Sequence, residues 1–167
     1  MIKLDENFFC RDVLETAPDL IGKFLAIKNK YGINYYMITE VEAYRGEEDK
    51  ACHARKGRTS RADIMYHSGG HIYVYLIYGM YWMLNFVTNT NNIPQAILIR
   101  GIEGYDGPGK LTRKLNIDGT YYGEHLCFSK RIWVEDKNQS PEIKVGARIG
   151  IEYAGEPWVH MPWRFYI

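Results

Sequence analysis

The sequence predicts an α+β fold in a single domain, residues 1–167. A chain of 167 residues with 46% hydrophobic content can bury one sizeable core but is short for two ordinary domains. Segments with the alternation or the β-branched and aromatic content of strands are grouped together, and the helical segments lie outside them instead of alternating as in βαβ repeats. No internal repeat or low-complexity tract divides the chain.

The predicted elements begin with helix. Apolar residues from Phe8 to Ala26 recur at roughly helical spacing, and Pro18 is expected to split this segment into two short helices. After a few turn-forming residues, Tyr35–Tyr44, "YYMITEVEAY", alternates in the way that is typical of a half-buried strand. The charged, glycine-containing residues 45–61 indicate a long loop or a short helix.

Four further segments complete the predicted order. Residues 69–87, "GGHIYVYLIYGMYWMLNFV", are rich in β-branched and aromatic residues, and the internal Gly79 predicts a hairpin that turns near it. Residues 95–103 predict another strand, and residues 107–117 predict a turn followed by a helix. Residues 147–155 predict a last strand.

The charge balance leaves any polyanion site to local clusters. Lys plus Arg number 21 against 20 Asp plus Glu, a formal charge of +1. Two basic runs exist, "HARKGRTSR" at residues 53–61 and "KLTRK" at residues 110–114. Either run alone is more often a solvated basic face than a binding site.

Cysteine usage and hydropathy predict a soluble, cytoplasmic protein, nucleoid-associated if bacterial. Cys10, Cys52 and Cys127 are widely spaced and form no C-x-x-C pair, which argues against a disulfide framework and a zinc ribbon. The first residues, "MIKLDENFF", are acidic, and no stretch approaches the ~20 apolar residues of a membrane span. No membrane partner is expected.

The strand predicted at Tyr35–Tyr44 carries two carboxylates on one face. Alternation places Glu40, Glu42 and Tyr44 on the same side, with the carboxylates roughly 6.6 Å apart at ~3.3 Å per residue. A carboxylate can activate water and offset an oxocarbenium-like sugar, and a neighbouring aromatic ring can stack a planar base, so the pair suits cleavage of a glycosidic bond to a base. The alternative is a solvent-facing strand surface on which each Glu lies near a Lys or Arg.

Other motifs give weaker signals. His67 and His71, with Cys52 and His53, lack the spacing of a zinc site, so no metal is expected. "GPGK" lacks the G-x-x-x-x-G-K-[ST] spacing of a phosphate loop, and no G-x-S-x-G occurs to indicate a serine hydrolase.

Several long blocks, taken in order, resemble those of the alkyladenine (3-methyladenine) DNA glycosylase family. They are "ITEVEAYRGEEDKACHARKGRTSR", "YVYLIYGMYWMLN", "AILIRGIE", "GPGKLT", "ARIGI" and "PWRFY". The resemblance covers nearly the whole chain, from about Phe8 to Ile167. It implies a mixed, mainly antiparallel β-sheet with peripheral helices and a DNA-intercalating β-hairpin that enters the minor groove.

The activity implied by the resemblance is that of a monofunctional DNA glycosylase, expected to act as a monomer without metal or organic cofactor. Such an enzyme flips a damaged purine out of double-stranded DNA and hydrolyses its N-glycosidic bond, leaving an abasic site. The implied substrates are 3-methyladenine and 7-methylguanine, with hypoxanthine and ethenoadenine as further candidates. In this resemblance Glu42 is the general base that activates the water, Arg100 helps to hold that water, and the backbone carbonyl of Ile149 is a further water contact.

The resemblance also implies the residues that would meet the base and the duplex. Tyr44, His53 and Tyr75 resemble the walls between which the base stacks, with the backbone N–H of His53 placed to hydrogen-bond the base edge. Asn85 resembles the side chain that collides with the 2-amino group of guanine, so that normal guanine fits badly. Outside the pocket, Tyr78 resembles the wedge that fills the gap in the duplex, with Met80 beside it. Arg58, Arg61 and Lys110 are candidates for phosphate contacts.

The sequence departs from the family pattern in two places. "RGIEGYDGPGKL" runs almost directly between two blocks that the family usually separates by a longer segment, so a DNA-facing loop is expected to be missing. Thr59-Ser60-Arg61 stands where the family has T-P-R, and "MYHSGG" where it has M-F-x-x-G-G. With a formal charge of +1, these departures predict weak duplex affinity and strong salt dependence.

Two alternatives stay open on the sequence. One is a non-catalytic module that stacks exposed bases on Tyr75 and Tyr78 and binds phosphates through its basic loops. The other is a bifunctional glycosylase with lyase action, which requires an amine nucleophile and a Schiff base.

Overall fold

In the computed structural model, which describes residues 2–167, the sheet is organised around one long strand, β3 (Gly32–Tyr44). The first half of β3 pairs with β2 (Phe24–Asn29), and its second half pairs with β6 (Gln95–Ile102) on one edge and β10 (Arg164–Tyr166) on the other. The second half is therefore interior to the sheet, which explains why Val41, Glu42 and Ala43 are buried.

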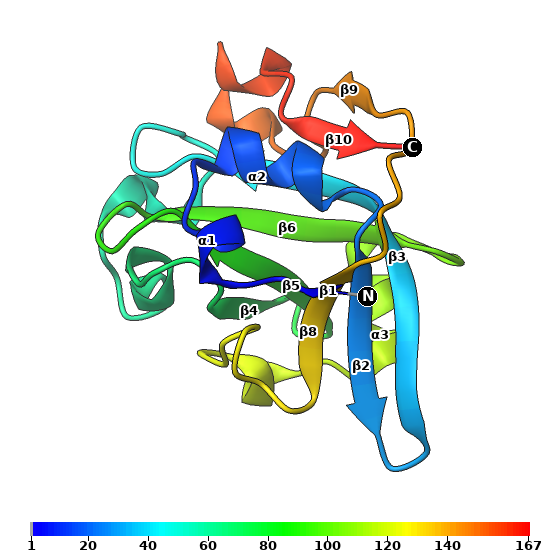
Figure 1. The fold of residues 1–167 in the computed structure, drawn as a ribbon. Coiled ribbons are helices and arrows are strands. Elements are labelled where there is room, and N and C mark those ends of the chain that lie inside the picture. Colours follow the sequence, from blue (N-terminus) through cyan, green and yellow to red (C-terminus); the bar gives the residue numbers. More distant parts are fainter. Residues whose placement is uncertain (1) are drawn as a thin grey trace.

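The sheet runs in the order β1-β8-β2-β3-β6-β5-β4, with β10 and β9 attached to β3 and the short β7 attached to β6 (Figure 1). The pairings described within residues 2–167 are all antiparallel. The remaining strands are β1 (Ile2–Lys3), β4 (Ile72–Ile77), β5 (Tyr81–Thr88), β7 (Tyr105–Asp106), β8 (Ile132–Asp136) and β9 (Lys144–Gly146). The predicted α+β class with a mainly antiparallel sheet is confirmed.

Three α-helices pack at the periphery of this sheet, namely α1 (Glu6–Phe9), α2 (Val13–Leu20) and α3 (Pro108–Leu115). α2 contacts β3 and β6, and α3 contacts β5 and β6. The main core is the set of buried aliphatic and aromatic side chains between these helices and the sheet. None of the helices within residues 2–167 has the length and apolar character needed to cross a bilayer.

The hairpin of β4 and β5 confirms the turn predicted near Gly79. Tyr78 and Gly79 have φ values of 49° and 65°, and the Met80 N–H donates to the Ile77 carbonyl at 3.0 Å. Positive φ at both central residues is the geometry of a type I′ turn, whose twist matches that of the flanking strands. Glycine supplies one of these positions without steric cost, while Tyr78 is held there despite its Cβ.

The N-terminal prediction was partly wrong. Two short helices do form, but the break lies at residues 10–12, and Pro18 sits inside α2, which ends two residues later. The helical spacing beyond Lys23 was misleading, because Phe24–Asn29 forms β2 and pairs with both β3 and β8. Hydrogen bonding along two edges outweighs the local apolar pattern.

The C-terminal prediction was also wrong, and β8 was not predicted. Residues 147–155 form no strand; Gly150 and Gly155 have φ values of 74° and 67°, which extended backbone does not allow, and a single turn of 3-10 helix, Glu152–Ala154, lies between them. The predictions of a strand at residues 95–103 and a helix within 107–117 are confirmed by β6 and α3. For residues 45–61 the prediction was a long loop or a short helix, and the structure has a loop that contains the 3-10 helix His53–Lys56.

Candidate active site

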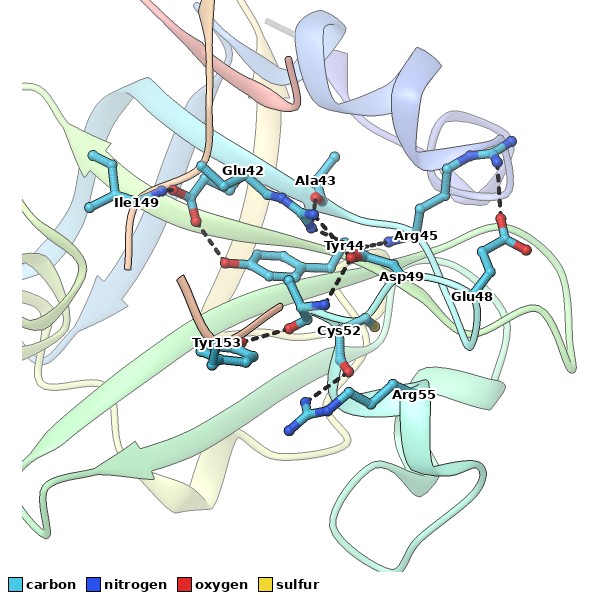
Figure 2. A network of polar contacts seen from close by, with 12 residues as sticks. Glu42, Ala43, Tyr44, Arg45, Glu48, Asp49, Cys52, Arg55, Ile149 and Tyr153 are labelled. Atoms are coloured by element: carbon cyan, nitrogen blue, oxygen red, sulfur yellow. Dashed lines mark hydrogen bonds and ion pairs between the residues drawn. The ribbon is translucent and has the colours of Figure 1, made fainter. Parts of the chain in front are cut away.

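Glu42 is the centre of the candidate site because it is a carboxylate with no exposed surface (0%). Its Oε1 accepts the Ile149 N–H at 2.7 Å, and its Oε2 accepts the Tyr44 hydroxyl at 2.8 Å (Figure 2). Arg100 Nε lies 3.6 Å from Oε1. Burial raises the pKa of Glu42 above its ordinary value, although the Arg100 cation and the two hydrogen bonds oppose this effect. The site therefore holds a positioned carboxylate with enhanced affinity for a proton.

Glu40 lies on the same side of β3 as Glu42 but has a different environment. Its Oε1 accepts Arg100 Nε at 3.3 Å and Arg164 Nη1 at 3.2 Å. The alternative interpretation was a solvent-facing strand surface on which each Glu lies near a Lys or Arg. It is wrong for Glu42, which is buried, but Glu40 does lie near two arginines. The register shifts between β3 and β6 near Ile38–Val41 lie where Arg100 reaches both carboxylates.

A small cavity next to Glu42 brings together the four side chains predicted to meet a base, Tyr44, His53, Tyr75 and Asn85. They come from three parts of the sequence, β3, the 3-10 helix His53–Lys56 and the β4–β5 hairpin. The other residues that line this cavity are Ala51, Cys52, Met65, Tyr73, Ala96 and Tyr153. Tyr44 joins the two features, since its ring lines the cavity and its hydroxyl donates to Glu42.

The aromatic wall of the cavity is fixed by contacts among its own members. The His53 and Tyr75 rings have centroids 4.5 Å apart at 63°, and His53 Nδ1 lies 2.7 Å from the Tyr73 hydroxyl oxygen. Burial, with the Arg61 and Arg55 cations, lowers the pKa of His53 to about 4. The imidazole is therefore neutral at physiological pH and adds no positive charge to the cavity.

Asn85 is held by its backbone neighbours on the hairpin. It is buried, and its Nδ2 donates to the carbonyl oxygens of Tyr73 and Met83 at 3.3 and 3.4 Å. An amide fixed in this way presents a rigid wall to anything that enters the cavity.

The side chains predicted to contact DNA outside the cavity have different surroundings. Tyr78 and Met80 project at the hairpin tip, with 86% and 60% of their surface exposed. Arg61 lines a groove beside the cavity, whereas Arg58 forms an ion pair with Asp63 at 2.7 Å. Lys110 is exposed near the start of α3, outside the residues that line this groove.

Sequence reasoning missed two basic residues of that groove. Its polar lining includes Arg55, Lys56 and Arg61, and it shares His53 and Tyr153 with the cavity. The run "HARKGRTSR" gave the signal, but the order of residues in a loop does not reveal which cations face the same side.

A buried ion pair behind Tyr44 was also missed. Arg148 Nη1 and Nη2 donate to Asp49 Oδ2 and Oδ1 at 2.6 and 3.0 Å, and both side chains are fully buried. Arg148 also donates to the Ala43 carbonyl at 3.1 Å, and its guanidinium lies 4.9 Å from the Tyr44 ring centroid. Because Arg148 lies against the Tyr44 ring and precedes Ile149, the pair fixes both the back of the cavity, behind Tyr44, and the N–H that binds Glu42.

Within residues 2–167 there is no group of three or more His, Cys, Asp or Glu side chains placed to hold a metal ion. His67 and His71 lie in contact with each other, with ring centroids 5.4 Å apart, while Cys52 and His53 lie at the cavity.

Comparison with known proteins shows the family to which the chain belongs. A family model described as Methylpurine-DNA glycosylase (MPG) matches residues 7–106 and 104–167. The chain belongs to this family. It is therefore a DNA glycosylase, a hydrolase of DNA repair that takes DNA as its substrate. The two matched ranges overlap at residues 104–106.

Curated relatives agree over nearly the whole length. A protein of Methanocella arvoryzae is 43% identical over 183 residues, covering 98% of this chain and 91% of the relative. A protein of Clostridium novyi is 38% identical over 195 residues, covering 100% and 96%, and one of Sodalis glossinidius is 43% identical over 169 residues, covering 97% and 95%. Each of the three carries the name "Putative 3-methyladenine DNA glycosylase".

Proposed function

We propose that the protein flips damaged purines out of double-stranded DNA and hydrolyses their N-glycosidic bond with a water that Glu42 activates. The proposed substrates are 3-methyladenine and 7-methylguanine, with hypoxanthine and ethenoadenine as further candidates. The observation that carries the proposal is the buried Glu42 carboxylate, joined by the Tyr44 hydroxyl at 2.8 Å to a cavity lined with aromatic rings. Catalysis by a monomer without metal or organic cofactor completes the proposal.

In the proposed reaction, the base stacks between Tyr44 on one side and His53 and Tyr75 on the other. Cation–π attraction of about 0.5–2 kcal/mol favours N-alkylated, positively charged purines on such rings. The pKa of His53, lowered to about 4, keeps the imidazole neutral and so avoids repelling a cationic base.

The Glu42 carboxylate favours bond cleavage because positive charge develops on the sugar as the bond breaks. The C1′–N bond breaks and its electron pair leaves with the base, which gives the sugar oxocarbenium character that the Glu42 carboxylate stabilises. The water oxygen bonds to C1′ and its proton passes to Glu42, whose pKa burial raises. Arg100, 3.6 Å from Glu42 Oε1, would hold the water and keep the carboxylate oriented, and the Ile149 carbonyl would be a further water contact.

Outside the cavity, the hairpin tip fits the role of a wedge. Tyr78 is exposed, sits at the apex of a tight turn and lies on the same hairpin as Tyr75 and Asn85. A ring in this place could fill the gap that a flipped nucleotide leaves in the duplex. Asn85 would make normal guanine fit badly through its 2-amino group, whereas 7-methylguanine, which carries the same group, is a positively charged base and a better leaving group.

The test incubates the protein with duplexes that contain a methylated purine or hypoxanthine and measures alkali-labile abasic sites. We expect release by the wild type and a loss of ~10²–10⁴-fold in Glu42→Gln, the range that a general base contributes. Glu40→Gln is the matched control, because Glu40 is a carboxylate on the same strand face that shares Arg100 with Glu42 but is not proposed to activate the water. Equal rates for wild type and Glu42→Gln would remove Glu42 from the mechanism.

Of the two alternatives, family membership decides against the non-catalytic binding module. The bifunctional glycosylase needs an amine at the sugar, and among residues 2–167 no lysine lines the base cavity, although Lys56 lines the groove beside it. We expect borohydride to trap no covalent adduct between the protein and a lesion-containing duplex.

A further inference from the structure

The cavity beside Glu42 is small. It offers about 40 Å³ of space to the centre of a water molecule. A base that enters so small a cavity must contact its walls closely, because protein interiors pack without large voids. The wall that yields most easily therefore decides how large a base fits.

Tyr153 is the wall with the fewest constraints. It is the one cavity-lining residue with an exposed side chain, 62% accessible, whereas the others are buried or half-buried. Two contacts hold the ring: its hydroxyl donates to the Ala51 carbonyl at 2.9 Å, and the Arg55 guanidinium lies 5.4 Å from its centroid. Figure 2 shows Tyr153 reaching from its own segment to the loop that carries Cys52.

The backbone beneath Tyr153 is anchored, which limits the movement to the side chain. Ile151 and Ala154 are buried against Ala51, so the residues on either side of the ring pack into the molecule. Gly150 and Gly155, both at positive φ, make the turns on either side of residues 151–154. Opening thus requires rotation of one side chain and exchange of one hydrogen bond for water.

Tyr153 lies between the base cavity and the basic groove. Its ring lines both the cavity and the groove with Arg55, Lys56 and Arg61. If DNA backbone follows that basic groove, a base that turns into the cavity has to pass Tyr153.

We propose that Tyr153 is the movable cap of the base cavity and that it limits the size of the damaged base that the protein accepts. The inference rests on the proposed function, because it assumes that the cavity receives a base. The ring swings outward with loss of its bond to Ala51, the base enters between Tyr44 and His53, and the ring then packs along the base edge. A base with an additional fused ring leaves less room for the Tyr153 ring to pack back against the base.

The experiment compares Tyr153→Ala with Tyr153→Phe, which keeps the ring but removes the bond to Ala51. Tyr31→Ala is the control, since Tyr31 is 85% exposed in the turn between β2 and β3. Single-turnover excision is measured on duplexes with hypoxanthine and with the larger ethenoadenine. We expect Tyr153→Ala to shift the ratio of the two rates toward ethenoadenine by about tenfold, the scale on which a pocket discriminates small steric differences, and Tyr153→Phe to shift it less. An unchanged ratio in Tyr153→Ala overturns the inference.

A second measurement separates this inference from the proposed function. If the wild type and Tyr153→Ala release neither lesion, the proposed function fails, and the cap is then judged by uptake of free ethenoadenine base, followed through its fluorescence in stopped flow. Faster association with Tyr153→Ala than with the wild type supports the cap. Equal association rates, or no binding by either protein, overturn it.

Discussion

Glu42, His53 and Arg148 each have a polar partner inside the protein, whereas Tyr78 and Met80 at the hairpin tip project into solvent. The buried region is assembled before any substrate arrives, since its groups are oriented by the fold. The exposed region can be completed only by a partner. The difference separates two kinds of effect: changes in the buried region should alter stability and the chemical step, and changes at the exposed tip should alter how duplex DNA is engaged.

The largest effect is expected from breaking the buried ion pair. Arg148→Met leaves the Asp49 carboxylate buried without its bidentate partner, and we expect the free energy of unfolding to fall by ~3–5 kcal/mol. Urea denaturation measures this directly. Arg58→Met, which breaks the exposed ion pair with Asp63, should change it far less, because solvent screens an exposed pair.

The double variant Asp49→Asn/Arg148→Met provides the internal check. It removes the unpaired charge, so it should be less destabilised than Arg148→Met alone. If Arg148→Met loses no more stability than Arg58→Met, the ion pair is not what fixes the back of the cavity.

This ion pair also marks the limit of what the sequence predicts. Asp49 and Arg148 are 99 residues apart, and neither residue has a local pattern that reports the other. The β4–β5 hairpin was predictable because Gly79 and the aromatic runs beside it act locally. The strand β2 was not, because its apolar spacing looks helical until β3 and β8 pair with both of its edges.

The candidate site, too, has a part that could be predicted from the sequence and a part that depends on the tertiary fold. The resemblance selected Tyr44, His53, Tyr75 and Asn85, and the fold brings these four to one cavity. It did not select Tyr153, because the terminal segment meets the cavity only through the tertiary fold. The roles of these residues toward a base stay predictions.

The next effect concerns the hairpin tip. Tyr78→Ala should slow single-turnover excision from duplex DNA by about 5–150-fold, since stacking of a base on an aromatic ring is worth ~1–3 kcal/mol. The loss should be smaller when the lesion lies opposite a mismatched base, because such a nucleotide leaves the stack more easily. An equal loss on both duplexes would mean that Tyr78 does not act as a wedge. Circular dichroism melting should show no loss of stability, as the ring is 86% exposed.

The pH dependence tests the buried carboxylate in two opposite ways. Activity needs ionised Glu42, so the excision rate should fall about tenfold per pH unit below the Glu42 pKa, which burial raises above 4.5. The free energy of unfolding should change in the opposite direction with pH. The folded state binds the Glu42 proton more tightly than the unfolded state does, so protonated Glu42 favours folding at low pH. This contribution is lost as pH rises through the folded pKa of Glu42.

Glu42→Gln is the matched variant for that experiment. The difference in free energy of unfolding between the wild type and Glu42→Gln, measured from pH 4 to pH 8, should move against the wild type as pH rises. A difference that stays constant with pH would indicate that the folded pKa of Glu42 is not raised.

The smallest expected effect is a change in the salt dependence of DNA binding, which should differ between the two neighbouring cations Lys56 and Arg58. Lys56 lines the groove beside the cavity, whereas Arg58 is paired with Asp63 at 2.7 Å and lies over the Tyr66 ring. If phosphates follow the groove, Lys56→Gln should reduce the slope of log affinity against log salt concentration by ~1, while Arg58→Gln should change it by less. Fluorescence anisotropy with an undamaged duplex over a salt series gives both slopes. The opposite order would place the DNA backbone over Arg58 and require its ion pair with Asp63 to open on binding.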